Sequence, residues 1–88
     1  MRVYDVVIAA DFQPVDLQAI SRTASRFISD IIIEYNVDEA NRVSVDVKSL
    51  LGMMTLAIHK GTRITIKTKG KDEKEAIDYL TDLIERYK

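Results

Sequence analysis

The spacing of apolar residues switches repeatedly along this 88-residue chain, and that switching limits the folds open to it. Some stretches place an apolar residue at every second position, as a β-strand with one buried face does. Others place one at every third or fourth position, as an amphipathic helix does. In chain order, the stretches predict β-α-β-β-α-β-α. Strands with one polar face and helices with one apolar stripe pack against each other, which predicts a two-layer α+β sandwich.

Four stretches carry the strand pattern. The first runs from Val3 to Ala9 and is rich in β-forming residues. The next two are joined by the polar segment NVDEAN (36–41), which predicts an antiparallel hairpin with a rather long loop. The last is expected to point Arg63, Lys67 and Lys69 toward solvent. The apolar residues expected to share strand faces are Tyr4, Val6 and Ile8, then Ile31, Ile33 and Tyr35, then Val43, Val45 and Val47, and finally Ile64 and Ile66.

Three helices are predicted. Pro14 suits the start of the first, because its missing N–H would be unpaired there anyway, and this helix is expected to span about four turns. The segment from Ser49 to Met54 has room for a short helix. In the last helix, Asp72 is expected to be the N-cap and Glu75 to complete a capping box. The expected stripes are Leu17, Ile20, Ala24 and Phe27 in the first helix and Ala76, Ile77, Leu80, Leu83, Ile84 and Tyr87 in the last, with Arg86 and Lys88 near its C-terminal end.

The length of the chain predicts one domain spanning residues 1–88, and its lack of cysteine makes the cytoplasm the simplest location. With 47% hydrophobic and 31% charged residues, the chain is typical of globular proteins, and it has no cysteine for a disulfide or a thiolate metal site. A net charge of −1 gives no reason to expect a nucleic-acid partner, and we expect neither a signal peptide nor a membrane span. The one histidine, His59, lies in a predicted turn with no serine or carboxylate tied to it by spacing. We therefore expect no enzyme active site, no metal and no cofactor.

The segment DVKSLLGMMTL (46–56) admits two interpretations. Ser49 follows a strand and precedes the short helix, so its hydroxyl is a candidate N-cap that accepts a backbone N–H. A phosphate there would add negative charge at the positive end of a helix, so the same serine is a candidate switch. The apolar residues that follow belong either to the core or to a docking surface, and so short a helix cannot turn all of them inward. These residues are Leu50, Leu51, Met53 and Met54.

Over nearly its whole length the sequence resembles HPr, the small histidine-containing phosphocarrier of the bacterial sugar phosphotransferase system. The resemblance is strongest in TASRFISDIIIEYN (23–36), VKSLLGMMTLAIHKGTRITI (47–66) and GKDEKEAIDYL (70–80). It implies an open-faced sandwich in which three helices cover one face of a four-stranded antiparallel sheet. It also implies that Ser49 is a regulatory serine, and that the apolar residues after it contact the family's kinase and transcriptional partners.

One part of the family's motif is absent. A phosphocarrier of this family has a Gly-x-His-x-Arg-Pro pattern at the start of its first helix, and the histidine takes a phosphoryl group from Enzyme I. Alignment back from Phe27 without gaps places Gln13 at the histidine, Val15 at the arginine and Asp16 at the proline. The chain is thus most similar to the histidine-less catabolite-repression HPr of bacilli, which also has glutamine at this position. That type keeps the arginine and the proline. The family also usually has a tight Asn-Gly turn in its hairpin, whereas the segment NVDEANR (36–42) makes this loop longer.

The resemblance favours a regulatory, non-enzymatic module of carbon catabolite control. An HPr kinase/phosphorylase-like enzyme would phosphorylate Ser49, and a carbon-control transcriptional regulator would then bind. Two alternatives stay open: phosphoryl transfer through another residue such as His59, and a binding scaffold in which Ser49 is only a cap. We expect protein partners without direct nucleic-acid or membrane contact, and a monomer or weak homodimer. The residues expected to contact partners are Leu50, Leu51, Met53, Met54 and Gln13.

Overall fold

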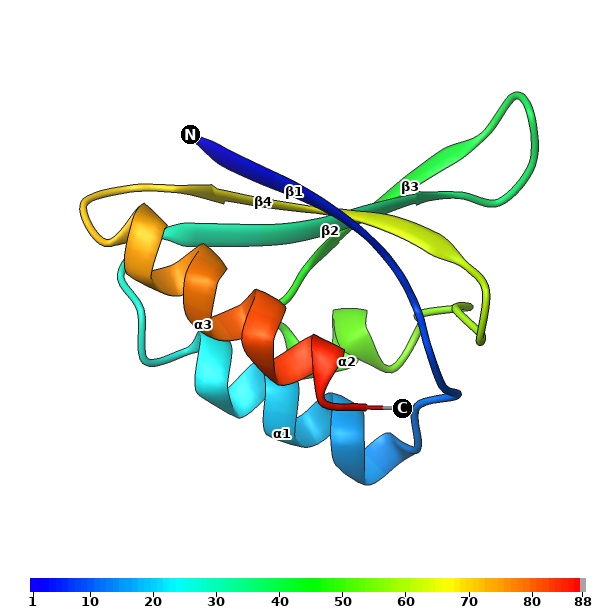
Figure 1. The fold of residues 1–88 in the computed structure, drawn as a ribbon, viewed down its shortest axis with the longest axis horizontal. Coiled ribbons are helices and arrows are strands. Elements are labelled where there is room, and N and C mark those ends of the chain that lie inside the picture. The colour runs from blue at the N-terminus through cyan, green and yellow to red at the C-terminus, as the bar shows by residue number, and fades with distance from the viewer. Residues whose placement is uncertain (88) are drawn as a thin grey trace.

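The computed structural model describes residues 1–87 and confirms the predicted order of strands and helices (Figure 1). Lys88, expected near the end of the last helix, lies outside the described residues. Within residues 1–87, no helix has both the length and the apolar character needed to cross a membrane. The strands are β1 (Arg2–Val7), β2 (Asp30–Asn36), β3 (Arg42–Asp46) and β4 (Arg63–Lys69), and the helices are α1 (Pro14–Ala24), α2 (Leu50–Met53) and α3 (Glu73–Glu85).

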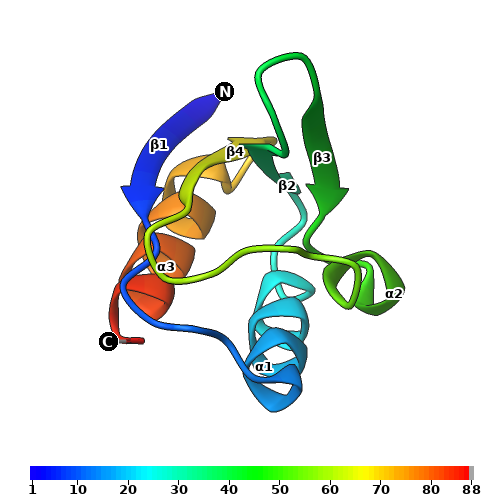
Figure 2. The ribbon, with the colours of Figure 1, turned by 90° about the vertical axis from the view of Figure 1, so that its right-hand side faces the viewer.

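All three helices lie on one face of a four-stranded sheet, as expected (Figures 1 and 2). The strand order is β1-β4-β2-β3, and every neighbouring pair is antiparallel. The predicted hairpin is formed by β2 and β3. Its loop is held by the Asp38 carboxylate, which accepts the N–H groups of Ala40 at 2.8 Å and Asn41 at 3.0 Å. The two edges of the sheet are therefore β1 and β3.

The face of the sheet opposite the helices is open and carries the predicted row of basic residues. Arg63 and Lys69 are exposed, whereas Lys67 is half-buried and its ammonium group lies 2.8 Å from the Glu34 carboxylate. Arg42 contacts the same carboxylate at 3.3 Å. The hydrogen bond from Lys67 is the main reason that the pKa of Glu34 is lowered. An acidic partner on the neighbouring strand thus interrupts the basic row.

The core lies between the sheet and the helices and consists mainly of residues from the predicted apolar stripes and strand faces. Ile33 and Ile66, which face each other on β2 and β4, are at most 2% exposed, and burying such a side chain contributes about 1.5–3 kcal/mol. Tyr4 on the edge strand β1 is less covered, and its hydroxyl donates to Glu85 of α3 at 2.7 Å. The other buried apolar residues are Ile8, Leu17, Ile20, Ala24, Ile31, Tyr35, Val45, Val47, Met53, Ile58, Ile64, Ala76, Ile77, Leu80 and Ile84.

The first helix is shorter than predicted. α1 has 11 residues, about three turns, and ends at Ala24, so Phe27 is not part of its stripe. The Ser25 hydroxyl donates to the Ser21 carbonyl at 3.0 Å, and serine side chains that bond to the backbone in this way compete with helix continuation. Phe27 instead lies in the segment after the helix, where its ring packs edge-on against Tyr79 of α3 with the ring centroids 6.0 Å apart.

The predicted capping box at the start of α3 is wrong. Asp72 is the N-cap residue, but its carboxylate accepts the N–H groups of Ile28 at 3.0 Å and Ser29 at 2.9 Å, together with the Ser29 hydroxyl. Glu75 is exposed. Gly70 allows this close approach, because a Cβ at that position would lie 2.7 Å from the Ser29 Cα. A contact between residues 43 positions apart thus replaces the local one that the sequence pattern predicts.

We predict that this contact makes the fold sensitive to acid. The hydrogen bond from the Ser29 hydroxyl holds the pKa of Asp72 below its ordinary value. Such a carboxylate stabilises the fold above its unfolded-state pKa of about 4, and its contribution is lost as the pH falls through the lower folded-state pKa. Between about pH 6 and pH 2, melting temperatures should therefore fall less in Asp72→Asn than in the wild type. The matched control is Asp78→Asn, an exposed aspartate of α3. Equal pH dependence in all three proteins would contradict the prediction.

Candidate functional site

Ser49 caps the start of α2, where the sequence places it. Its backbone is extended (φ −88°, ψ 112°), and its Oγ accepts the N–H of Gly52 at 3.1 Å. Asp46 holds the preceding turn, because its side chain accepts the N–H of Lys48 and its carbonyl accepts the N–H of Ser49, both at 3.0 Å. Ser49 is half-buried. Its hydroxyl is thus fixed against the first turn of α2 while part of the residue remains accessible.

Three apolar side chains beside Ser49 face solvent. Leu50 is 45% exposed, Leu51 82% and Met54 48%, and we call these three residues the α2 patch. The helix consists of four residues and packs against α1 and β3, so only one side of it can be covered. Exposed apolar side chains gathered on one element are typical of a contact surface.

Met53 does not belong to this surface, and its prediction as a partner-binding residue is wrong. Its side chain is 0% exposed and forms part of the core, although it precedes Met54 directly. Successive residues of a helix are rotated by about 100°, so Met54 cannot point inward together with Met53. The exposed surface is therefore smaller than the sequence predicts.

A groove of about 310 Å³ lies between α1 and α2, beside the α2 patch. Leu50 forms part of it, and Arg22 of α1 and Lys48 of the turn before α2 contribute its two basic groups. The remaining lining residues are Gln18, Ser21 and Ser25. Because no lining residue is acidic, the groove is electrostatically suited to a negatively charged group.

The start of α1 already holds a negative charge. Gln13 is the N-cap of this helix and Pro14 its first residue. The Asp16 carboxylate accepts the N–H of Gln13 at 2.8 Å, so it occupies the helix N-terminus, where an anion would otherwise bind. Val15, the second residue of α1, is 66% exposed and carries no charge. This turn therefore supplies neither a nucleophile nor a cation for a phosphoryl group.

His59 lies in the exposed turn between α2 and β4. Its N–H donates to the Thr62 hydroxyl at 3.0 Å, and the N–H of Lys60 donates to the Asp11 carboxylate at 2.8 Å. This turn differs from a helix N-terminus, which offers several backbone N–H groups to a phosphoryl group. The geometry around His59 gives no support to its use as a phosphoryl acceptor.

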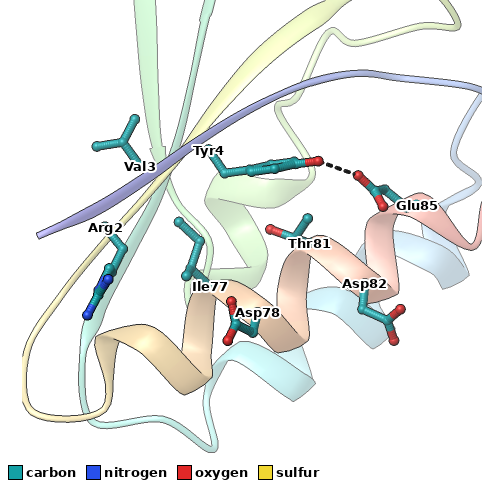
Figure 3. A pocket seen from close by; sticks show the side chains of 8 residues that line it. All are labelled: Arg2, Val3, Tyr4, Ile77, Asp78, Thr81, Asp82 and Glu85. Carbon is teal, nitrogen blue, oxygen red and sulfur yellow. Dashed lines mark hydrogen bonds between the residues drawn. The ribbon is translucent and has the colours of Figure 1, made fainter.

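A second concave site, which the sequence does not indicate, lies between β1 and α3 (Figure 3). This cleft of about 370 Å³ is lined by the carboxylates of Asp78, Asp82 and Glu85 and by Tyr4, among others. The Tyr4 hydroxyl donates a hydrogen bond to Glu85, and this bond, together with the charge of the Glu85 carboxylate, raises the pKa of Tyr4. Tyr4 and Glu85 are 81 residues apart, so no local pattern reveals their pairing. Across residues 1–87, no three histidine, aspartate or glutamate side chains are grouped so that they could hold a metal ion.

Comparisons with known proteins agree on one family. The sequence profile of a family described as "PTS HPr component phosphorylation site" matches residues 17–86. The phosphocarrier protein HPr of Neisseria meningitidis serogroup A is 43% identical over 67 residues, which cover 76% of this chain and 70% of the relative. The HPr-like protein Crh of Halalkalibacterium halodurans is 43% identical over 63 residues, which cover 72% of this chain and 69% of the relative.

A solved structure extends the similarity to the whole fold. HPr-C-His from Thermoanaerobacter tengcongensis superposes with a TM-score of 0.79 at 31% identity, covering 97% of this chain and 92% of the other. The family match includes Ser49 and the α2 patch. It begins at Leu17, however, and leaves the segment from Gln13 to Asp16 outside.

Proposed function

The chain belongs to the HPr family of the phosphotransferase system, and on that premise we propose that it is a regulatory member that does not itself carry phosphoryl groups. In this proposal, phosphorylation of Ser49 switches the affinity of the α2 patch for a protein partner. The family match over residues 17–86 supports membership of the HPr family, and the glutamine at position 13 is what favours the histidine-less, catabolite-repression type.

The start of α1 supports the loss of carrier function. Gln13 stands where the resemblance places the carrier histidine, and an amide nitrogen is a poor nucleophile because its lone pair is delocalised into the carbonyl group. The Asp16 carboxylate accepts the backbone N–H of Gln13 at 2.8 Å, and its negative charge would repel an incoming phosphoryl group. In the proposal, α1 therefore packs and contacts partners but takes no part in phosphoryl transfer.

The observation that carries the proposal is the position of the Ser49 hydroxyl at the N-cap of α2. Phosphorylation there would add about −1.5 to −2 charge next to unpaired N–H groups of the first helical turn. Lys48 and Arg22 line the groove beside this turn and provide basic groups on the same side of the molecule. A phosphate would thus be accommodated without unfolding α2, and the rim of the α2 patch would become negative.

The α2 patch supplies the apolar part of the proposed docking surface. Leu51 is its most exposed member, so it is the side chain from which a partner can remove the most apolar area. Gln13 is a proposed polar contact on the neighbouring helix. The partners we propose are an HPr kinase/phosphorylase-like enzyme and, after phosphorylation, a carbon-control transcriptional regulator.

The switch is tested with an HPr kinase/phosphorylase and ATP, followed by mass spectrometry. We expect one phosphate on the wild type and none on Ser49→Ala. Trypsin cleaves after Lys48 and Lys60, so the phosphate should map to the peptide 49–60. Thr55 provides the other hydroxyl of that peptide, and Thr55→Val, the matched control, should keep the phosphate. A wild type that stays unmodified under conditions that phosphorylate an authentic HPr would rule out the switch, as would phosphate persisting on Ser49→Ala.

A further inference from the structure

Two neighbouring methionines differ completely in their exposure to solvent. Met53 is 0% exposed and lies in the core, whereas Met54 is 48% exposed and belongs to the α2 patch. The N–H of Met54 donates to the Leu50 carbonyl at 3.0 Å, so Met54 lies one helical turn after Leu50, on the same side of α2. Peroxides oxidise accessible thioethers much faster than buried ones. A reactive sulfur thus lies within the proposed docking surface.

We propose that Met54 is a redox-sensitive modification site that controls docking to the α2 patch. The oxidant is hydrogen peroxide. The sulfur lone pair attacks one peroxide oxygen, the O–O bond breaks, an S–O bond forms, and the other oxygen leaves as water after a proton transfer. The sulfur loses two electrons and the peroxide gains them. Methionine sulfoxide reductase converts the sulfoxide back to the thioether, so the modification is reversible.

Oxidation of Met54 changes the patch and leaves the fold intact. The sulfoxide replaces an apolar sulfur by a polar S–O group, which weakens apolar contacts with a partner. The hydrogen bond from the Met54 N–H to Leu50 does not involve the side chain. Met53, whose oxidation would disrupt the core, is shielded from the oxidant by burial. This control of docking rests on the proposed function of the α2 patch. The assignment of Met54 as the reactive sulfur is independent of that function, because it rests on the exposure of the side chain.

Met1 provides an internal reference for an accessible thioether. It is 67% exposed and precedes β1, which lies at the opposite edge of the sheet from β3. Since α2 follows β3 in the chain and packs against it, oxidation of Met1 takes place away from the α2 patch. A variant at position 54 therefore separates the effect of Met54 oxidation on docking from any effect of Met1 oxidation.

The reactive site is tested by treating the intact protein with hydrogen peroxide and measuring the oxygen added to each methionine. The tryptic peptide 49–60 contains both Met53 and Met54, so fragment ions give the two rates from one peptide. We expect Met54 to oxidise at least about tenfold faster than Met53, and within a few-fold of the rate of Met1. Equal rates for Met53 and Met54, or slower oxidation of Met54, would overturn the assignment.

The effect on docking is tested by the rate at which the HPr kinase phosphorylates Ser49, measured before treatment and after the peroxide has been removed. We expect oxidised wild type to react about five- to tenfold more slowly, and reductase treatment to restore the rate. The rate of Met54→Leu, compared with its own untreated value, should change less than about twofold. An unchanged phosphorylation rate in oxidised wild type would contradict the control of docking by Met54, but it would not contradict the proposed switch at Ser49. Failure of the untreated protein to be phosphorylated would contradict the proposed function instead, and the oxidation rates would still decide the reactive site.

Discussion

Incubated with phosphoenolpyruvate and Enzyme I, the protein is expected to gain no acid-labile phosphate, while an authentic HPr treated in parallel becomes phosphorylated. The expected loss is complete because Gln13 provides no nucleophilic nitrogen. The backbone N–H of Gln13 donates to the Asp16 carboxylate at 2.8 Å, which places a negative charge where the phosphoryl group would have to approach. The measurement is acid-labile phosphate, or the mass of the intact protein, after a fixed incubation.

A series of variants distinguishes the effect of the missing nucleophile from the effect of the charge around it. Gln13→His restores the imidazole but keeps Asp16, so we expect only slow phosphorylation. Adding Val15→Arg and Asp16→Asn supplies a cation and removes the carboxylate, and this triple variant should react at least about tenfold faster than Gln13→His. Acid-labile phosphate on the wild type that disappears in His59→Ala would contradict this account and revive phosphoryl transfer through the turn histidine.

Alanine substitutions at the two adjacent methionines are expected to differ widely in their effect on stability. Met53→Ala removes a fully buried side chain and should lower the free energy of unfolding by about 2–4 kcal/mol. For a domain of this size, that loss corresponds to a melting temperature lower by about 10–25 °C. Met54→Ala removes a half-exposed side chain and should change the stability by no more than about 0.5 kcal/mol.

The pair is well matched, because both variants replace methionine by alanine at neighbouring positions of the same short segment. Thermal and denaturant unfolding, monitored by circular dichroism, provide the comparison. Similar losses of stability in the two variants would contradict the burial of Met53 and, with it, the assignment of the α2 patch. A stable Met54→Ala variant is also suited to partner-binding experiments, since any loss of affinity then reports on the surface alone.

The features that the sequence predicts correctly depend on short-range patterns. The alternation in β2, with Ile31, Ile33 and Tyr35 buried, is set by the period of a strand, and its register against β3 follows from the hairpin. The cap at Ser49 is local as well, since its partner Gly52 is three residues away. Fold class, order of elements and the serine cap could therefore be predicted from residue spacing and family resemblance.

The features that it misses depend on contacts between distant segments. The Asp72 carboxylate bonds to Ser29 rather than to its own helix, and the cleft beside α3 depends on Tyr4 from the first strand. In the site, spacing alone cannot tell which residue of a four-residue helix turns inward, because that depends on how α2 packs against α1 and β3. The sequence therefore assigned Met53 to the surface together with Met54.

The most direct test of the proposed switch is the affinity of the carbon-control regulator for the protein before and after complete phosphorylation of Ser49, measured by isothermal titration calorimetry. The phosphate should form charge-assisted hydrogen bonds across the interface, and we predict that it tightens binding at least about tenfold. Leu51→Glu, which places a charge in the α2 patch, should abolish that gain when it is compared after kinase treatment long enough to phosphorylate its Ser49 completely. Equal affinities for the two forms, with the phosphate verified on Ser49, would contradict the switch and identify the serine as only a helix cap.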